Sequence, residues 1–429
     1  MTTDFASFPE LVNNQRPRVL LQAYACSPYR GGEPGMGWNR VLEMARYFDT
    51  WVLCKQQRYE PDIRKYFAEQ GHCKGLHFQF VPRTRFEKLL KRIPGLFYLA
   101  YNLWVRRAYR VALKLYGEHP FDLIHQVNFN SYREPGYLWK LNVPFIWGPV
   151  GGTQNYPWRF LHRAGLGGAV VEGLRNIVNN LQFRFSPRVR AAARRAEVLL
   201  TANSEGKADF ERVHKLNSIL LLETGICVVE EEGFEHTIDD GPLKILWSGV
   251  FGHKKALHLL LEALSRLPET ARYELRILGR GPLEKRWKKI ARKVKVEANC
   301  TWLGWLPYYE ALNQYKWADL FVFTSLRDTS GNVVLEALSW GVPVICLDHQ
   351  GAGDIVTPEC GIKIPVTIPQ EVISGLRDAL LEFSQNKDIL VVLSRGALQR
   401  AQKYLWSRNG EQMAEIYFKV LRSQARNGR

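Results

Sequence analysis

One pattern occurs twice in this chain of 429 residues: a short apolar run, then a glycine-containing loop, then helical spacing. The first copy begins at Arg18–Ala25 and the second at Leu243–Trp247. Short apolar runs of this kind are typical of strands buried in a parallel sheet. A strand, a glycine loop and a helix form the opening unit of a doubly wound α/β domain. The sequence therefore predicts two such domains in tandem.

Further apolar runs follow each opening unit and alternate with longer polar or helical stretches, which predicts βα repetition in both halves. Helical spacing is expected over 39–47 after the first strand and over 257–267 after its counterpart. The remaining predicted strands are Thr50–Cys54, His77–Val81, Leu123–Val127, Pro144–Trp147, Val198–Ala202, Leu275–Leu278, Leu320–Thr324 and Pro343–Leu347.

The division between the halves is predicted at an acidic stretch that has no strong period and ends in Gly-Pro. We expect a linker over 229–242 between an N-terminal domain, 1–228, and a C-terminal domain, 243–407. The last stretch again has helical apolar spacing, and we expect a helix over 408–429 to pack back on the N-terminal domain. Ligands of open α/β sheets lie at the carboxyl ends of the strands, which here would face a cleft between the domains.

The composition limits the classes of partner. With 13 Trp, 18 Tyr and 21 Phe the chain is not a disordered one. A net charge of +17 implies an anionic partner, which is a nucleic acid, an acidic lipid surface or a phosphate-bearing substrate. The 7 scattered cysteines without C-x-x-C predict reduced thiols in a cytosolic protein, and neither a signal peptide nor a membrane-spanning helix is expected.

The strongest site signal is the stretch Phe323–Ala337, in which Asp328 and Glu336 stand eight positions apart. Gly331 lies where a loop is expected to turn into a helix, so the backbone N–H groups of Ser330, Gly331 and Asn332 would be free to face an anion. Glu336 would accept ribose hydroxyls, and Asp328 those of a sugar. The alternative is an ordinary capped helix start with a solvated Glu336. Spacing alone does not separate the two.

This stretch resembles the E-x7-E motif of glycosyltransferase family 4, whose fold is GT-B, two facing Rossmann-like domains with a cleft between them. In that family the first acid contacts the transferred sugar, the inner glycine precedes backbone contacts to the donor, and the second acid binds the ribose. The resemblance assigns these roles to Asp328, Gly331 and Glu336. The first acid is Asp here instead of the usual Glu.

A second resemblance lies in the loop after Leu243–Trp247. Ser248–Ala256 is similar to the family's G-R-L…K-G loop, whose Arg and Lys hold the donor diphosphate. Lys255 matches that lysine, whereas Val250 stands where the arginine is expected, and Lys254 or His253 would compensate in part. The alternative is a basic surface loop. Gly279-Arg-Gly281-Pro also resembles the family's G-x-G-P turn, and Gly351–Val356 resembles the loop after the E-x7-E helix.

The N-terminal half carries the rest of the resemblance. Arg30-Gly-Gly-Glu-Pro-Gly35 is similar to the glycine loop of a subgroup with G-G/S-E-P-G, and paired glycines let a backbone approach a diphosphate closely. His125 ends a predicted strand, where the family has a histidine over the sugar face. A lone histidine at a strand end is otherwise a packed residue.

The predicted site is therefore as follows: catalysis by His125, Lys255 and Asp328; donor binding by Gly31, Gly32, Gly249, Lys254, Lys255, Gly279, Gly281, Asp328, Ser330, Gly331, Asn332 and Glu336; and acceptor contact by Glu33, Gly151 and Gly152.

The resemblance implies a retaining hexosyltransferase that uses a UDP- or GDP-linked sugar without a cofactor or a bound metal. Its acceptor would be a glycan or a lipid-linked saccharide, in cell-surface polysaccharide or glycolipid synthesis. Two alternatives share the fold, a phosphorylase or sugar-phosphate synthase and a non-catalytic partner protein. Nucleic acid is not an expected partner, because no helix-turn-helix, finger or RNP-like signature is present.

A basic, aromatic stretch, 83–116, has nine Arg or Lys against the single Glu87, with Tyr101 and Trp104 among its aromatics. Basic amphipathic helices with aromatic residues bind membrane interfaces. The alternative is a helix pair that packs its apolar face on the sheet. We expect a cytoplasmic protein with possible peripheral contact to the inner face of the cell membrane through 83–116.

Overall fold

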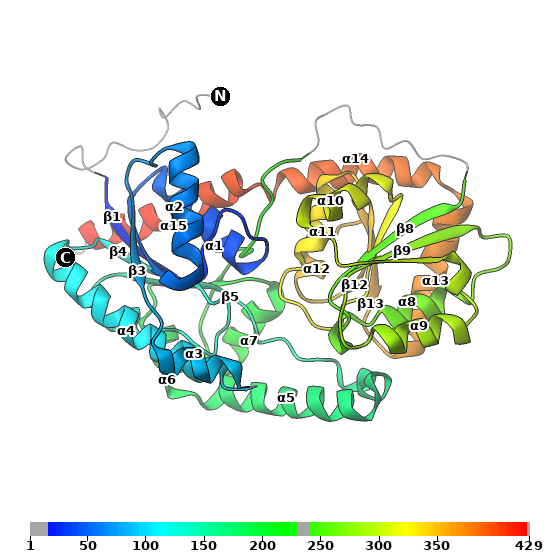
Figure 1. Cartoon of the computed structure of the whole chain (residues 1–429), viewed down its shortest axis with the longest axis horizontal. Coiled ribbons are helices and arrows are strands. Elements are labelled where there is room, and N and C mark those ends of the chain that lie inside the picture. The colour runs from blue at the N-terminus through cyan, green and yellow to red at the C-terminus, as the bar shows by residue number, and fades with distance from the viewer. Residues whose placement is uncertain (1–15, 94, 230–240, 427–429) are drawn as a thin grey trace.

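The computed structural model describes residues 16–93, 95–229 and 241–426. It contains a parallel sheet of seven strands and a second parallel sheet of six. Each sheet forms a lobe with its own helices, the first mainly blue to green and the second green to orange in Figure 1. This is the predicted pair of doubly wound domains. Most of the predicted linker 229–242 lies outside the described residues.

The first sheet has the order β3-β2-β1-β4-β5-β6-β7. Every residue of its central strands β4 and β5 is buried, as expected for a sheet covered by helices on both faces. The elements of this half are β1 (Arg18–Ala23), α1 (Glu33–Ala45), β2 (Asp49–Lys55), α2 (Gln56–Gln70), β3 (Leu76–Val81), α3 (Arg85–Arg92), α4 (Phe97–Glu118), β4 (Leu123–Asn128), η2 (Leu138–Lys140), β5 (Phe145–Val150), η3 (Trp158–Ala164), α5 (Gly165–Phe185), α6 (Pro187–Arg195), β6 (Val198–Thr201), α7 (Ser204–His214) and β7 (Ile219–Leu220).

The second sheet has the order β10-β9-β8-β11-β12-β13. Helices α8 and α13 pack together on one side of it, and α11 packs on α14. The elements of this half are β8 (Leu243–Ser248), η4 (His253–Lys255), α8 (Leu257–Leu264), β9 (Tyr273–Leu278), α9 (Glu284–Lys293), η5 (Glu297–Asn299), β10 (Cys300–Gly304), α10 (Tyr308–Trp317), β11 (Leu320–Phe323), α11 (Asn332–Ser339), β12 (Val344–Asp348), α12 (Gln350–Ile355), β13 (Gly361–Pro365), α13 (Pro369–Gln385), α14 (Asp388–Gln402) and α15 (Trp406–Arg426).

The strand orders determine where a ligand can bind. Each order reverses beside the first strand of its domain, between β1 and β4 in one sheet and between β8 and β11 in the other. At such a switch point the two neighbouring loops diverge and leave a crevice at the carboxyl ends of the strands. The loops that follow β1, β4, β8 and β11 are therefore the ones that build the site.

The last helix, α15, belongs to the first lobe although it ends the chain. It packs on α1, and Met413 and Tyr417 are fully buried in the core beneath the first sheet. In Figure 1 this red helix crosses from the second lobe to the first. The polypeptide therefore connects the lobes twice, once after β7 and once through α15.

The structure corrects several element boundaries. Helix α1 begins at Glu33, not at residue 39, with Gly32 as its N-cap and Pro34 in its first turn, because proline is favoured at that position. Strands β7, β10 and β13 were not predicted from the sequence. All three lie at sheet edges. The two residues of β7 are exposed, no residue of β10 is fully buried and only two of the five in β13 are, so they differ from the buried strands that the sequence predicts.

Residues 83–116 form α3 and most of α4. Tyr101 and Trp104 are fully buried in the first core, and Trp104 Nε1 donates a hydrogen bond to Val81 O at 3.0 Å. For these two aromatics the alternative prediction, a helix packed on the sheet, is the correct one. Most of the exposed apolar side chains in this stretch lie on α3 and at the start of α4, including Phe86 and Leu89, and Leu113 lies further along α4.

Candidate functional site

Lys255 and Asp328 meet at the switch point of the second sheet. Lys255 ends η4 in the loop after β8, and Asp328 lies in the loop after β11. The Lys255 ammonium group forms an ion pair with the Asp328 carboxylate, and Lys255 Nζ also lies 4.6 Å above the Phe323 ring. Two residues that are far apart in the sequence are adjacent because β8 and β11 are neighbouring strands.

This pair fixes the charge of Asp328. Burial alone would raise the pKa of Asp328, but the ammonium groups of Lys255 and Lys254 outweigh burial, and its pKa is lowered from the ordinary value. Burial lowers the pKa of Lys254. The Asp328 backbone N–H donates a hydrogen bond to Gln350 Oε1 on α12 at 2.5 Å. The loop therefore holds an ionised carboxylate against a lysine.

The start of α11 lies immediately beside this pair. Gly331 is the N-cap residue, with a φ of 79° that favours glycine. Asn332 is the first residue of the helix, and its side-chain oxygen lies 3.3 Å from Ser330 Oγ. The first turn of a helix has unpaired N–H groups and the positive end of the helix dipole. An ammonium group and a helix start together form a site suited to an anion.

Glu336 lies one turn further along α11, facing α10. Tyr315 Oη donates a hydrogen bond to Glu336 Oε2 at 3.1 Å. Burial raises the pKa of Glu336, and the Tyr315 hydroxyl partly opposes that rise. Burial, and next the charge of Glu336, raises the pKa of Tyr308, whose ring would be 4.0 Å from a Cβ atom added at Gly31. Glu336 and the glycine loop of the first domain therefore face each other across Tyr308.

The glycines after β8 and β9 let two loops touch. A Cβ atom at Gly279 would lie 1.9 Å from Gly249 O, and one at Gly281 would lie 2.6 Å from Phe251 O. Both positions require glycine because backbone of the neighbouring loop occupies the space. These predicted donor residues thus shape the loop that presents Lys255. Val250, in the same loop, is 63% exposed.

In the first domain, the glycine loop after β1 carries Glu33, whose pKa is shifted in the opposite direction to that of Asp328. Glu33 Oε1 accepts a hydrogen bond from the Asn130 backbone N–H at 3.0 Å. Burial raises the pKa of Glu33 to about 7, although that hydrogen bond opposes the rise. Gly32 has a φ of 65°. The predicted acceptor residue therefore lies at the carboxyl end of β4, where it links the loops after β1 and β4.

The predicted acceptor glycines lie at the contact between the domains. A Cβ atom at Gly151 would lie 2.4 Å from Thr329 Cγ2 in the second domain, and one at Gly152 3.3 Å from Ser131 Oγ in its own domain. Asn203 Nδ2, at the start of α7, donates a hydrogen bond to Thr329 O at 2.8 Å. The loop that carries Asp328 is therefore held directly against the first domain.

The structure contradicts the position predicted for His125. It lies within β4, which continues to Asn128, and its side chain is fully buried. Nε2–H donates to Gly148 O, and Nδ1 accepts from the Tyr417 hydroxyl of α15. Burial lowers the pKa of His125 to about 3. His125 is a packed core residue, the alternative left open by the sequence, because its ring faces α15 and not the cleft.

Glu223, which the sequence did not predict as a site residue, is a buried carboxyl group at the crossing between the lobes. Burial raises its pKa to about 7, a hydrogen bond from Ser330 opposes this rise, and the charges of Asp328 and Glu33 add to it. Its Oε2 has no hydrogen-bond partner. The available signal was a single acid within the apolar run 219–226.

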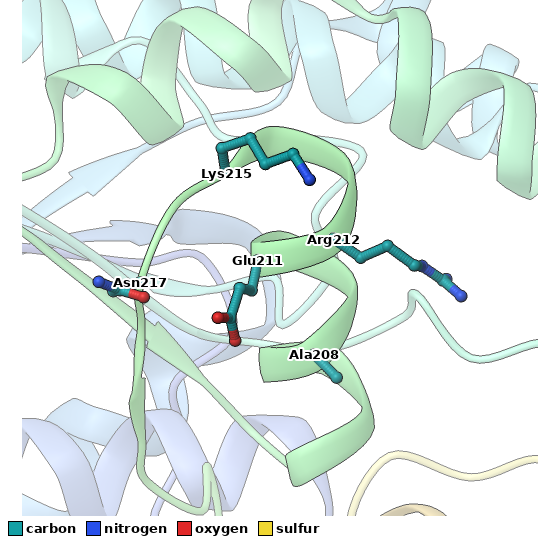
Figure 2. Close-up of a pocket in the computed structure, with 5 residues that line it drawn as sticks. All are labelled: Ala208, Glu211, Arg212, Lys215 and Asn217. Carbon is teal, nitrogen blue, oxygen red and sulfur yellow. The ribbon is translucent and has the colours of Figure 1, made fainter.

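Other features lie outside this cleft. Figure 2 shows a surface depression at the end of α7, where Glu211 and Asn217 lie on one side and Arg212 points away; it contains none of the predicted site residues. All 7 cysteines are free. In the described part of the chain, no cluster of three or more His, Cys, Asp or Glu is arranged to hold a metal ion. Within those same residues, no helix is long and apolar enough to cross a membrane.

Comparison of the sequence with known proteins finds a matching family and relatives that are similar over part of the chain. The family described as "Glycosyl transferases group 1" matches residues 228–394, which include Lys255, Asp328 and Glu336. The putative colanic acid biosynthesis glycosyltransferase WcaL of Salmonella typhimurium is 28% identical over 184 residues, 41% of this chain and 45% of the relative. The lipopolysaccharide core biosynthesis glycosyltransferase LpsE of Rhizobium meliloti is 30% identical over 132 residues, 30% of this chain and 36% of the relative. The chain thus spans less than half the length of these relatives.

Comparison of the structure covers both domains. The apo form of the lipopolysaccharide outer core galactosyltransferase WaaB superposes with a TM-score of 0.62 at 13% identity, over 94% of this chain and 99% of that chain. Anabaena Alr3699/HepE in complex with UDP and glucose superposes with a TM-score of 0.60 at 15% identity, over 94% and 100%. At such identities the likeness shows the fold, which is GT-B. Residues 228–394 match the family of glycosyl transferases group 1, and the GT-B fold extends over both domains.

Proposed function

We propose that this chain is a retaining hexosyltransferase that uses a UDP- or GDP-linked sugar. Its acceptor is a glycan or a lipid-linked saccharide, in cell-surface polysaccharide or glycolipid synthesis. The observation that carries the proposal is the pairing of Lys255 with Asp328 beside the start of α11. The names of WcaL and LpsE support the biosynthetic setting, and the UDP and glucose bound by HepE support the donor class.

In this proposal the diphosphate of the donor binds between Lys255 and the first turn of α11. Negative charge grows on the departing diphosphate as the bond from the sugar C1 to oxygen breaks. A fixed cation and the N–H groups of Gly331 and Asn332 stabilise that charge most in the transition state. The Lys255–Asp328 ion pair then opens, so that the lysine contacts phosphate and the carboxylate accepts hydroxyls of the sugar.

Glu336 binds the ribose of the nucleotide. Its carboxylate is held by Tyr315, with Oε2 3.1 Å from the tyrosine hydroxyl, and its other oxygen is available to ribose hydroxyls. The glycine loop at Gly31–Gly32 covers the donor from the opposite domain. The acceptor hydroxyl attacks C1 from the face that the diphosphate leaves, and its proton passes to the departing diphosphate. Retention by this route is what the resemblance to family 4 implies.

We propose that no bound metal is needed, because Lys255 and the helix start supply the positive charge that a divalent cation would otherwise supply. EDTA should leave the rate of transfer unchanged within about twofold. Loss of activity in EDTA that is restored by Mn²⁺ or Mg²⁺ would contradict this part of the proposal.

The proposed location is cytoplasmic, with peripheral contact to the inner face of the cell membrane. The contact cannot use Tyr101 or Trp104, which are buried. Phe86 and Leu89 of α3 are 59% and 56% exposed, and they stand among Arg85, Lys88 and Lys91. This part of 83–116 fits a surface that carries anionic lipid.

A thermal-shift screen against UDP-, GDP- and ADP-linked hexoses is the first test, because a ligand that binds only the folded state raises its melting temperature. The donor that shifts the melting temperature is then incubated with a lipid extract, and the anomeric configuration of the product is read by NMR. A UDP- or GDP-sugar should give both the shift and an α-linked product from an α-linked donor. No shift with any donor, and no transfer, would favour the non-catalytic alternative. The observation that favours this alternative is the exposed Val250 at the position where the family resemblance leads us to expect an arginine.

A further inference from the structure

Helix α5 is oriented opposite to an ordinary surface helix. Its polar residues Glu172, Asn176 and Asn179 are buried against the protein, while most of its large apolar residues, with the exception of Phe183, face outward. A helix of a globular protein normally buries its apolar stripe. The outward residues and their exposed fractions are Leu166 92%, Val170 60%, Val171 61%, Leu174 58%, Ile177 48%, Val178 49%, Leu181 52% and Phe185 61%.

The buried polar face explains why the helix keeps this orientation. Asn176 Oδ1 accepts from the Tyr156 N–H at 2.9 Å, and Asn176 Nδ2 donates to Tyr156 O at 2.7 Å. Asn179 Nδ2 donates to Thr153 O at 2.7 Å. Glu172 pairs with Arg327, at 3.1 Å. These bonds would be lost if the helix turned its apolar side inward, so the outward stripe is a fixed feature of the surface.

The stripe is long and straight. Its outward residues extend from 166 to 185, which corresponds to about 30 Å of helix at 1.5 Å per residue. Figure 1 shows α5 running along the outer edge of the molecule, below the first lobe and reaching toward the second. A continuous apolar surface of this length is uncommon on a soluble monomer and marks a docking surface.

The charges around the stripe indicate what docks there. Residues 157–195 contain eight Arg against Glu172, and 83–116 contain nine Arg or Lys against Glu87. Both acids are buried, with side chains 8% and 2% exposed, and each pairs with an arginine. These two segments therefore carry nearly all of the net charge of +17. An apolar stripe within a basic rim matches an anionic bilayer.

The exposed part of α3 adjoins this surface. Phe86 and Leu89 of α3 are 59% and 56% exposed, and Ile93, directly after the helix, is 45% exposed. At the start of α4, Tyr98 lies 6.0 Å from the Arg133 guanidinium, and Arg133 Nε donates to Gln182 of α5 at 3.1 Å. The apolar residues of α3 and α5 thus flank one basic junction.

We propose that the outward face of α5, with α3 beside it, docks on an anionic phospholipid bilayer. The inference rests on the membrane contact in the proposed function, and it assigns most of that contact to α5 instead of to 83–116. A second copy of the chain fits this face poorly, because it would bring two basic rims together. Since Arg327 pairs with Glu172 and precedes Asp328, the docked helix would lie between the bilayer and the donor loop.

The test is vesicle flotation of the full chain with phosphatidylcholine alone and with phosphatidylcholine containing phosphatidylglycerol. The variant is Leu174→Gln, Ile177→Gln and Leu181→Gln together. The wild type should float with the anionic vesicles at low salt and bind neutral ones weakly. The triple variant should lower the partition coefficient by about 100-fold, because three aliphatic side chains no longer enter the bilayer.

The control changes three exposed apolar residues elsewhere, Leu220→Gln, Ile368→Gln and Val392→Gln, which are 44%, 37% and 67% exposed. This variant should float like the wild type, and both variants should melt within a few degrees of it. Equal flotation of the α5 variant and the wild type would overturn the inference. So would a lipid-free wild-type dimer that the α5 variant converts to a monomer, because a second copy would then cover the face.

A third variant separates this inference from the function proposed above. If Phe86→Gln with Leu89→Gln abolishes flotation while the α5 variant does not, α3 alone makes the contact and the inference on α5 fails. The donor-induced thermal shift should be the same in all variants. If no nucleotide sugar shifts the wild type, the proposed sugar transfer fails, and the flotation result still decides the role of α5.

Discussion

The two domains place a carboxyl group at the same point of the same fold, and the two groups have opposite electrostatic states. Asp328, beside β8 and β11, has a lowered pKa because Lys255 and Lys254 outweigh its burial. Glu33, beside β1 and β4, has a pKa raised to about 7 by burial, with only a backbone N–H to oppose the rise. One switch point therefore holds an ionised carboxylate, whereas the carboxyl group at the other can take up a proton near neutral pH.

The difference shows how one architecture serves two ligands. A cation and a helix start suit the diphosphate of a donor, whereas a carboxyl group whose pKa is raised to about 7 beside backbone donors suits the hydroxyls of a saccharide. Glu223 belongs with Glu33 in this respect, since burial raises its pKa to about 7 as well. The comparison predicts that variants in the second domain change kcat or the KM for the donor. It also predicts that Glu33 makes the stability of the fold depend on pH.

The largest effect is expected for Lys255→Met. Removing the cation should lower kcat by about 100- to 1000-fold, because the charge that grows on the diphosphate loses its fixed partner. Steady-state transfer with the donor identified by thermal shift measures this. Lys255→Arg should recover part of the rate.

A double variant separates charge from stability at this position. Lys255→Met leaves Asp328 partly buried without its partner and should destabilise the fold, whereas Lys255→Met with Asp328→Asn should restore the melting temperature without restoring kcat. Normal turnover in Lys255→Met would mean that the diphosphate binds elsewhere. The ion pair at the switch point of the second domain would then have no role in donor binding.

The next effect is expected for Glu336→Gln. The variant should raise the KM for the donor by about 10- to 100-fold, since hydrogen bonds to a charged group contribute about 1.5–3 kcal/mol. Tyr315→Phe, which removes the hydroxyl that holds Glu336, should give a smaller rise in the same constant. A change confined to kcat, with KM unaltered, would argue against ribose binding.

Glu33 should make the stability of the protein depend on pH. Its pKa is about 7 in the folded state against an ordinary 4.5, so the folded state holds the proton more tightly than the unfolded chain. Its contribution to stability is complete below the unfolded value and is lost as the pH rises through about 7. Between pH 5 and 8 the wild type should lose about 2–3 kcal/mol of unfolding free energy relative to Glu33→Gln.

Urea unfolding of both proteins at several pH values measures this difference. Glu223→Gln is the companion variant, because its carboxyl group is shifted in the same direction. Asp328 should act in the opposite sense, with stability lost as the pH falls through its lowered pKa. Parallel pH curves for the wild type and Glu33→Gln would show that Glu33 is not held neutral, and the two switch points would then be alike.

The sequence predicted what depends on local pattern and strand order. Lys255 and Asp328 follow strands that a doubly wound order makes neighbours, and the structure brings the two residues together. The sequence did not predict Glu223 or Asn203 as site residues, because their contacts with the loop at 328–330 join segments more than 100 residues apart. His125 was misplaced because a periodic apolar run marks a strand but not its last residue. The orientation of its ring depends on α15, which local sequence cannot reveal.

The smallest effect is expected at Val250, where the family resemblance leads us to expect an arginine. Val250 is 63% exposed in the loop after β8, so Val250→Arg should fold normally and place a solvent-screened cation near the proposed diphosphate. Exposed charge pairs contribute about 0.2–1 kcal/mol, which corresponds to a fall in donor KM of at most about fivefold. Val250→Gln controls for side-chain size, and 0.5 M salt should remove the gain. A rise in KM with arginine would mean that Lys254 already supplies the positive charge expected from the family's arginine, so that a further cation at position 250 hinders donor binding.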